Sequence, residues 1–169
     1  MGCKEKQLME VLIITGACGV GKSTIAKAWA KLKQGAIVEC DYFTEWIYKP
    51  DFPHWTVEEE RFVASMTVVV ANEYIKHHMP VAIENVWSPK GIQLLVDGLK
   101  RQTLIRSLKV VWLLCDLDEN HRRDRLRIPE NQMKERVDIV NQELRGYAWP
   151  EYVQVVDSTR LSIAKQLII

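Results

Sequence analysis

The chain has 169 residues, which is enough for one well-buried domain and too few for two of ordinary size, so we expect a single domain over residues 1–169. Its apolar share of 47% and charged share of 27% are typical of a soluble globular protein, and no run approaches the roughly 20 apolar residues of a membrane helix. A formal charge of +1 excludes a general attraction to nucleic acid or to an anionic membrane.

The cysteines favour the reducing cytoplasm as the location. Cys3, Cys18, Cys40 and Cys115 are far apart in the sequence and form no CxxC pair of the kind that a zinc site uses, so we expect free thiols. The start of the chain does not complete a myristoylation signal, because position 6 is Lys rather than Ser or Thr. We therefore expect a cytoplasmic protein without a membrane anchor.

Short apolar runs rich in Val and Ile alternate with longer helical patterns along the chain. This alternation predicts an α/β fold with a small, doubly wound, five-stranded parallel sheet flanked by helices on both faces. The expected strands are residues 11–15, 36–40, 81–84, 109–115 and 153–156.

Two of the expected helices have recognisable start signals. Thr56 followed by Glu59 has the spacing of a capping box, and apolar residues then recur at helical intervals, so a long helix precedes the third strand. Ser88 followed by Pro89 is typical of an N-cap with proline at the first helical position, and it opens a helix toward Arg101.

A phosphate-binding motif follows the first strand. It satisfies the P-loop (Walker A) pattern GxxxxGK[ST], and it lies between an apolar strand and a helical run. Glycines let the backbone curl so that N–H groups point at phosphate oxygens, and the helix start adds partial positive charge. Lys22 can reach the outer phosphates, and Ser23 is placed to hold Mg²⁺. We therefore predict a site for the phosphates of ATP or a similar nucleotide. Its residues are Gly16, Ala17, Cys18, Gly19, Val20, Gly21, Lys22, Ser23 and Thr24.

Switch proteins, motors and kinases share the P-loop, so other residues must distinguish them. A guanine-nucleotide switch needs NKxD and DxxG motifs, and neither occurs in the sequence. A mechanical ATPase generally needs a longer chain and a strand that ends in two acids. The nearest matches here, at Glu84 and Asp116, carry one acid each.

The strand ends are similar to those of one P-loop group. Strand two ends in Glu39 and Asp41, strand three ends in Glu84, and strand four leads into the arginine-rich stretch 121–127. With this layout the chain resembles the small P-loop kinases of metabolites and antibiotics, the group that includes shikimate kinase, gluconate kinase and chloramphenicol phosphotransferase. The resemblance spans nearly the whole chain in the order of its elements, and its motifs outside the P-loop are short.

The resemblance implies roles for the acids at the strand ends. An Asp at the end of strand two takes the proton of the acceptor hydroxyl in those families, and Asp41 is the matching position. The alternative is a turn residue that caps the next segment. Glu84 matches an acid that holds a Mg²⁺-bound water, although many of those kinases carry Asp there. Glu39 either helps to order water around Mg²⁺ or is solvated. Parallel-sheet ligands lie beyond the carboxyl ends of strands, so we expect these acids and the P-loop to share one crevice.

The arginines after strand four match the mobile lid of those kinases. We expect a helix capped by Asp118 and ended by Pro129, within a lid of residues 118–135. Arg123 and Arg127 lie one turn apart on one face of such a helix, where the resemblance implies that they steady the charge of the transferring phosphate. The alternative is a solvated helix whose arginines pair with neighbouring acids.

The acceptor is expected to be a small molecule with a hydroxyl group. The irregular stretch 42–55 is rich in aromatic residues, some of which can form the wall of an acceptor pocket. A nucleoside monophosphate kinase needs a second phosphate clamp, typically of arginines, and Arg61 is the only arginine between Lys33 and Arg101. This argues against a phosphorylated acceptor.

Together these features predict an ATP- and Mg²⁺-dependent kinase that moves the γ-phosphate to a sugar, sugar acid, nucleoside or antibiotic. Ser23 and, through water, Glu84 are the expected metal ligands. The alternatives are a nucleoside or nucleotide kinase, and a nucleotide-binding regulator without turnover. The sequence leaves the oligomeric state open. The expected catalytic residues are Lys22, Asp41, Arg123 and Arg127.

Overall fold

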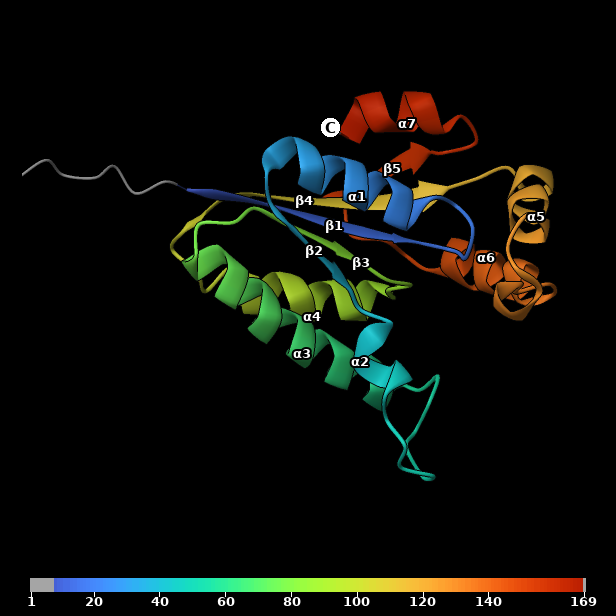
Figure 1. Cartoon of the computed structure of the whole chain (residues 1–169), viewed down its shortest axis with the longest axis horizontal. Coiled ribbons are helices and arrows are strands. Elements are labelled where there is room, and N and C mark those ends of the chain that lie inside the picture. Colours follow the sequence, from blue (N-terminus) through green and yellow to red (C-terminus); the bar gives the residue numbers. More distant parts are fainter. Residues whose placement is uncertain (1–7, 169) are drawn as a thin grey trace, which may run out of the picture.

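The sheet of this protein lies between two layers of helices (Figure 1). The structure is a computed structural model that describes residues 8–168, so Cys3 and the start of the chain lie outside the described residues. Five parallel strands form one sheet in the order β2-β3-β1-β4-β5, which confirms the predicted fold class. The strands are β1 (Met9–Gly16), β2 (Ala36–Glu39), β3 (Val81–Glu84), β4 (Ile105–Leu114) and β5 (Val153–Asp157).

Helices cover both faces of the sheet and one of its ends. In Figure 1, α1 and α7 lie on one face, α3 and α4 lie on the other, and α5 and α6 lie beyond the carboxyl ends of the strands. Between residues 8 and 168, every helix is too short or too polar to cross a bilayer. The helices are α1 (Lys22–Lys33), α2 (Tyr42–Glu45), α3 (Val57–Lys76), α4 (Pro89–Leu99), α5 (Leu117–Arg125), the 3₁₀ helix η1 (Pro129–Asn131), α6 (Arg136–Gly146) and α7 (Leu161–Ile168).

The central strand β1 is buried on both faces along residues 11–14, which explains the apolar run at these positions. Its residues 11–14 each keep at most 1% of their surface exposed, because helices cover the sheet from both sides. β1 pairs with β3 and with β4, and its last residue, Gly16, begins the P-loop. The buried central strand therefore leads directly into the phosphate motif.

The two predicted helix starts are present. Thr56 Oγ1 accepts a hydrogen bond from the Glu59 N–H at 3.2 Å, at the start of α3. Ser88 Oγ accepts one from the Gly91 N–H at 3.1 Å, and Pro89 opens α4. The second helix ends at Leu99, slightly before the predicted position.

The helix after strand four differs from its prediction at both ends. Its N-cap is Asp116 rather than Asp118, because Asp116 Oδ1 accepts a hydrogen bond from the Glu119 N–H at 3.2 Å as soon as β4 ends. The helix also ends at Arg125, before the expected Pro129, which instead opens η1. The α5–α6 segment, residues 126–135, is therefore mostly irregular.

We predict that Thr15→Val lowers the free energy of unfolding by about 2 kcal/mol, because it leaves two buried backbone groups without partners. Thr15 Oγ1 accepts a hydrogen bond from the Trp87 N–H at 2.8 Å and donates one to the Trp87 carbonyl at 3.0 Å. Thr15→Ser keeps the hydroxyl and serves as the control, with a much smaller expected loss. Urea unfolding measures both variants, and equal losses would contradict the importance of the hydroxyl.

Candidate nucleotide and acceptor site

The P-loop backbone adopts a conformation that only glycine accepts easily. Gly19 and Gly21 have φ angles of 84° and 101°, in the left-handed region. Neighbouring side chains also exclude a Cβ at both positions. A Cβ added to Gly19 would lie 2.6 Å from Asn120 Nδ2, and a Cβ added to Gly21 would lie 2.5 Å from Leu161 Cδ2. The glycines of the motif therefore serve both the curl of the loop and its close packing.

Side chains outside the loop hold two of its carbonyl groups. Asn120 Nδ2 donates to the Cys18 carbonyl at 2.6 Å. The Val20 carbonyl accepts from Ser158 Oγ at 2.7 Å and from Arg123 Nη1 at 3.3 Å. Carbonyl oxygens that are bound from outside cannot face a phosphate, so this arrangement favours a loop interior lined by N–H groups.

Lys22, Ser23 and Glu84 lie together at the carboxyl ends of β1 and β3. Lys22 Nζ donates to the Ala17 carbonyl at 3.1 Å, and Ser23 Oγ donates to Glu84 Oε1 at 2.9 Å. Glu84 keeps only 6% of its surface exposed. Burial raises the pKa of its carboxyl, and the nearby Lys22 ammonium and the Ser23 hydrogen bond oppose that rise. An oxygen pair of this kind suits Mg²⁺, which prefers hydroxyl, carboxylate and water ligands.

The acids at the end of β2 lie beside this group. Glu39 is opposite Glu84 in the sheet, and its Oε1 is 2.7 Å from Lys27 Nζ on α1. The next residue, Cys40, is buried, and burial raises the pKa of its thiol to about 12. Its backbone N–H donates to the Glu84 carbonyl at 3.2 Å, which ties the start of the following segment to β3. Asp41 is exposed and its side chain makes no capping hydrogen bond to α2.

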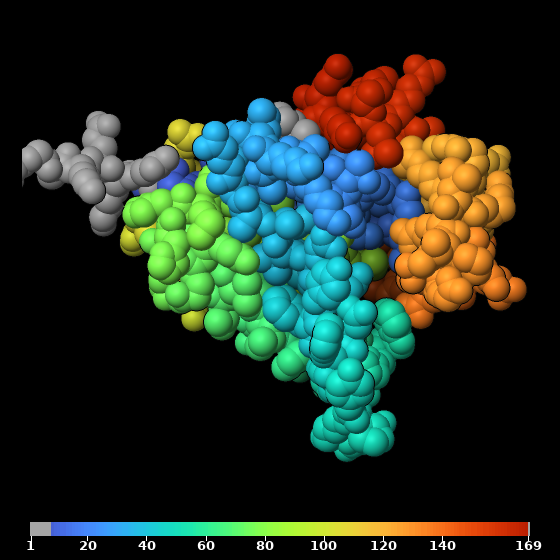
Figure 2. Space-filling model, in the orientation of Figure 1, coloured from blue at the N-terminus to red at the C-terminus, as the bar shows by residue number. Residues whose placement is uncertain are grey.

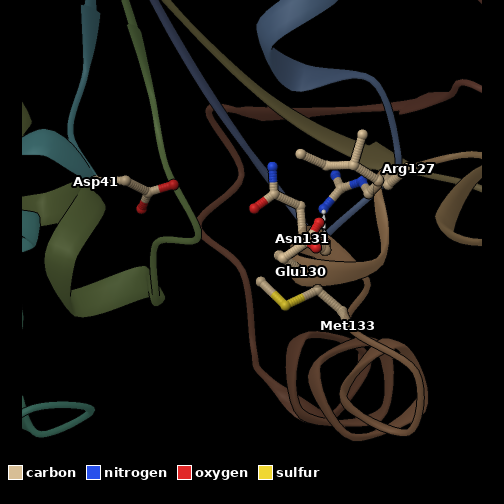
Figure 3. Close-up of a pocket in the computed structure, with 6 residues that line it drawn as sticks. Asp41, Arg127, Glu130, Asn131 and Met133 are labelled. Atoms are coloured by element: carbon tan, nitrogen blue, oxygen red, sulfur yellow. Dashed lines mark hydrogen bonds between the residues drawn. The ribbon is translucent and has the colours of Figure 1, made fainter.

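Asp41 faces the α5–α6 segment across a cavity of ≈ 500 Å³ (Figure 3). Arg127 lines the opposite side, where its Nη1 donates to the Asn131 carbonyl at 3.3 Å. Figure 2 shows the corresponding hollow between the segment around α2 and the α5–α6 region. The full lining is Asp41, Arg127, Ile128, Glu130, Asn131 and Met133.

The expected aromatic wall is absent from the lining of this cavity. Trp46, Tyr48 and Trp55 are 71%, 86% and 75% exposed, because the loop between α2 and α3 projects away from the sheet. Trp55 instead packs under a cation. The guanidinium carbon of Arg136, at the start of α6, lies 3.9 Å from the centroid of its ring. This contact joins the loop to α6.

The two arginines that were predicted to share one helix face lie in different environments. Arg123 is mostly buried, and its Nη2 donates to the carbonyls of Ser158 and Thr159 at 2.9 and 2.8 Å. Its Nε donates to Glu119 at 2.7 Å, so most of its donors are occupied. Arg127 lies beyond the end of α5 and lines the cavity. The prediction that both arginines share one helix face is wrong, because α5 ends two residues before Arg127.

Three contributors to the site were missed in the sequence: Asn120, Ser158 and Arg136. Asn120 on α5 and Ser158 in the loop after β5 are fully buried polar residues, and no sequence motif marked either of them. Arg136 lies outside the stretch in which acceptor-side arginines were counted, and only the fold brings it next to Trp55.

No protein-family model matches the chain. Several solved structures share its fold over nearly their whole length. A sugar kinase from Janibacter sp. HTCC2649 aligns with 95% of this chain and 95% of its own, with a TM-score of 0.67 and 15% identity. A gluconokinase from Sinorhizobium meliloti 1021 aligns with 96% of this chain and 91% of its own, with a TM-score of 0.63 and 15% identity.

A shikimate kinase from Bacteroides thetaiotaomicron aligns with 94% of this chain and 96% of its own, with a TM-score of 0.56 and 21% identity. At such identities the likeness concerns the fold. The predicted resemblance to small-molecule kinases is thus confirmed at that level. The chain has the fold of the P-loop small-molecule kinase structures to which it is similar.

Proposed function

We propose that the protein is an ATP- and Mg²⁺-dependent kinase that transfers the γ-phosphate to a hydroxyl group of a small molecule. The observation that carries this proposal is the cavity in which Asp41 faces Arg127, in a chain that carries a complete P-loop motif after β1. A free carboxylate suits the acceptor side of the reaction, and an arginine that is not fully occupied suits the charged phosphate. Candidate acceptors are sugars, sugar acids, nucleosides and antibiotics.

The reaction needs positioning more than covalent help from the protein. The acceptor oxygen attacks the γ-phosphorus, its proton passes to the Asp41 carboxylate, and the bond between the γ-phosphorus and the bridging oxygen breaks as ADP leaves with the electron pair. Lys22 and the loop N–H groups hold the phosphates during this exchange. Ser23 would bind Mg²⁺ directly and Glu84 through water, and the ion would supply positive charge beside the phosphates.

The two arginines support different parts of this proposal. Arg127 is placed to approach the transferring phosphate when the α5–α6 segment acts as a lid. Arg123 braces the P-loop against the loop between β5 and α7 through the carbonyls of Val20 and Ser158. We therefore assign Arg127 to the chemistry and Arg123 to the shape of the nucleotide site.

A phosphorylated acceptor, such as a nucleotide, is the second candidate. Arg127 lines the cavity, and Arg136 at the start of α6 follows the cavity-lining Met133 by three residues, so these two cations are the candidates for a second phosphate clamp. Free Cys18, Cys40 and Cys115 support the cytoplasm as the proposed location.

An acceptor panel tests the proposal. The protein is incubated with ATP and Mg²⁺ and with single sugars, sugar acids, nucleosides, nucleotides or aminoglycosides, and products are identified by their mass. A kinase adds one phosphate to a particular acceptor class. A regulator without turnover binds nucleotide and consumes no ATP with any member of the panel.

We predict that Asp41→Asn reduces acceptor phosphorylation by roughly 10² or more and leaves ATP affinity within a few-fold, because the lost carboxylate serves the acceptor rather than the phosphates. Single-turnover rates with the acceptor from the panel measure the effect. Asp51→Asn is the matched control, since Asp51 is an exposed acid of the loop that follows α2 and forms an ion pair with Lys49 at 3.4 Å. Parental rates in Asp41→Asn would leave Glu39 or Glu84 as the candidate base.

We predict that Lys22→Ala weakens ATP binding by about tenfold or more, because its ammonium group is expected to reach the outer phosphates, with little change in thermal stability, because its hydrogen bond in this structure goes to the loop's own Ala17 carbonyl. Isothermal titration calorimetry measures the affinity. Lys31→Ala removes an exposed lysine from the same helix and should bind like the parent. Unchanged affinity in a folded Lys22→Ala variant would overturn the phosphate site.

We predict that Arg127→Ala lowers turnover by roughly 10² while ATP affinity changes little, because its charge acts mainly in the transition state. Arg123→Ala should instead weaken ATP binding and lower the melting temperature, since it removes contacts to the Val20, Ser158 and Thr159 carbonyls. Arg125→Ala, which changes an exposed residue of the same helix, is the control. The assignment of different roles is wrong if the Arg123 and Arg127 variants show the same changes in turnover, ATP affinity and melting temperature.

A further inference from the structure

Two buried asparagines connect the P-loop to the helices on either side of the α5–α6 segment. Asn120 on α5 is fully buried, and Asn141 on α6 is 6% exposed. Buried amides are costly unless their polar atoms are paired, so two of them in contact indicate a specific arrangement. The segment between these helices is the one that lines the cavity opposite Asp41.

Hydrogen bonds fix the direction in which both amides point. Asn141 Nδ2 donates to the Val137 carbonyl at 2.8 Å and to Asn120 Oδ1 at 2.9 Å. Asn120 Nδ2 donates to the Cys18 carbonyl at 2.6 Å. Both ends of this chain are backbone carbonyls, which only accept hydrogen bonds. Asn141 must therefore turn its NH₂ group toward Asn120, and Asn120 must turn its own NH₂ group toward the P-loop.

The side chain of Asn120 contacts the P-loop at Cys18 and Gly19, where the backbone conformation and the close packing both restrict movement. Cys18 precedes Gly19, whose φ angle is 84° and whose missing Cβ would meet Asn120 Nδ2 at 2.6 Å. A rotation of the Cys18 carbonyl into the loop would bring an oxygen toward the phosphates and repel them. The amide of Asn120 opposes this rotation, and Asn141 keeps that amide in the orientation that does so.

We propose that Asn120 and Asn141 are positioning residues that set the phosphate affinity of the P-loop, and that Asn141 acts only through Asn120. This inference rests on the proposed function in one respect, namely that residues 16–24 bind the phosphates of a nucleotide. It adds that the two helices flanking the α5–α6 segment take part in forming the phosphate site.

The test is ADP binding by Asn141→Asp. A carboxylate at this position only accepts hydrogen bonds, so Asn120 must turn its NH₂ group toward it and its Oδ1 toward the Cys18 carbonyl. Two acceptors then face each other, and we expect the Kd for ADP to rise about tenfold or more. Asn141→Leu removes the donor without inverting the amide, so we expect a smaller rise of about threefold. The Kd for adenosine, which lacks phosphates, should stay unchanged in both variants.

Asp138→Ala is the matched control. Asp138 Oδ1 is 2.9 Å from His121 Nε2, so this pair also joins α5 to α6, and within residues 8–168 neither side chain has a hydrogen bond to the P-loop. We expect parental ADP affinity in this variant. A parental Kd for ADP in folded Asn141→Asp overturns the inference, as does an equal weakening by Asp138→Ala. If Asn141→Asp does not fold, Asn141→Leu becomes the test of the inference. An unchanged Kd for ADP in Asn141→Leu would then also overturn the inference. A parent protein that does not bind ADP would contradict the phosphate site itself.

Discussion

The proposed phosphate site depends on the outward orientation of the Cys18 and Val20 carbonyl groups. A loop that binds phosphate must turn N–H groups inward, and its carbonyl oxygens then need donors outside the loop. Those donors come from two parts of the chain: Asn120 and Arg123 lie on α5, and Ser158 lies in the loop after β5. The central strand β1 fixes one end of the loop, and these side chains fix its outer surface. The P-loop is therefore shaped by the whole carboxyl edge of the sheet.

The strands and the P-loop were predictable because their signals are local. Buried parallel strands have continuous apolar sequences, and the P-loop pattern is a run of adjacent residues. The start of α5 was not predictable in the same way, because Asp116 and Asp118 are both good N-caps and the end of β4 decides between them. Its end was missed because the Asp124 carboxylate accepts hydrogen bonds from the Met133 and Lys134 N–H groups at 3.0 and 2.9 Å, which folds the chain back.

The acceptor side was less predictable because it is made by contacts between distant segments. Periodicity placed Arg123 and Arg127 on one helix face, and the fold sends one to the P-loop and the other to the cavity. A count of arginines between strands two and three could not include Arg136, which comes from α6 and stacks on Trp55. Sequence patterns thus identified the P-loop motif and the acids at the strand ends, and they gave little information about which residues line the cavity.

Charge around the strand ends supports a cation in the proposed reaction. Three carboxylates, those of Glu39, Asp41 and Glu84, lie near a loop that is shaped for anionic phosphates. Lys27 pairs with Glu39, and burial raises the pKa of Glu84 although the Lys22 ammonium and the Ser23 hydrogen bond oppose that rise. Bound phosphates would raise this repulsion further. A divalent cation between Ser23, Glu84 and the phosphates would offset it, so the same acids that repel free nucleotide favour its Mg²⁺ complex.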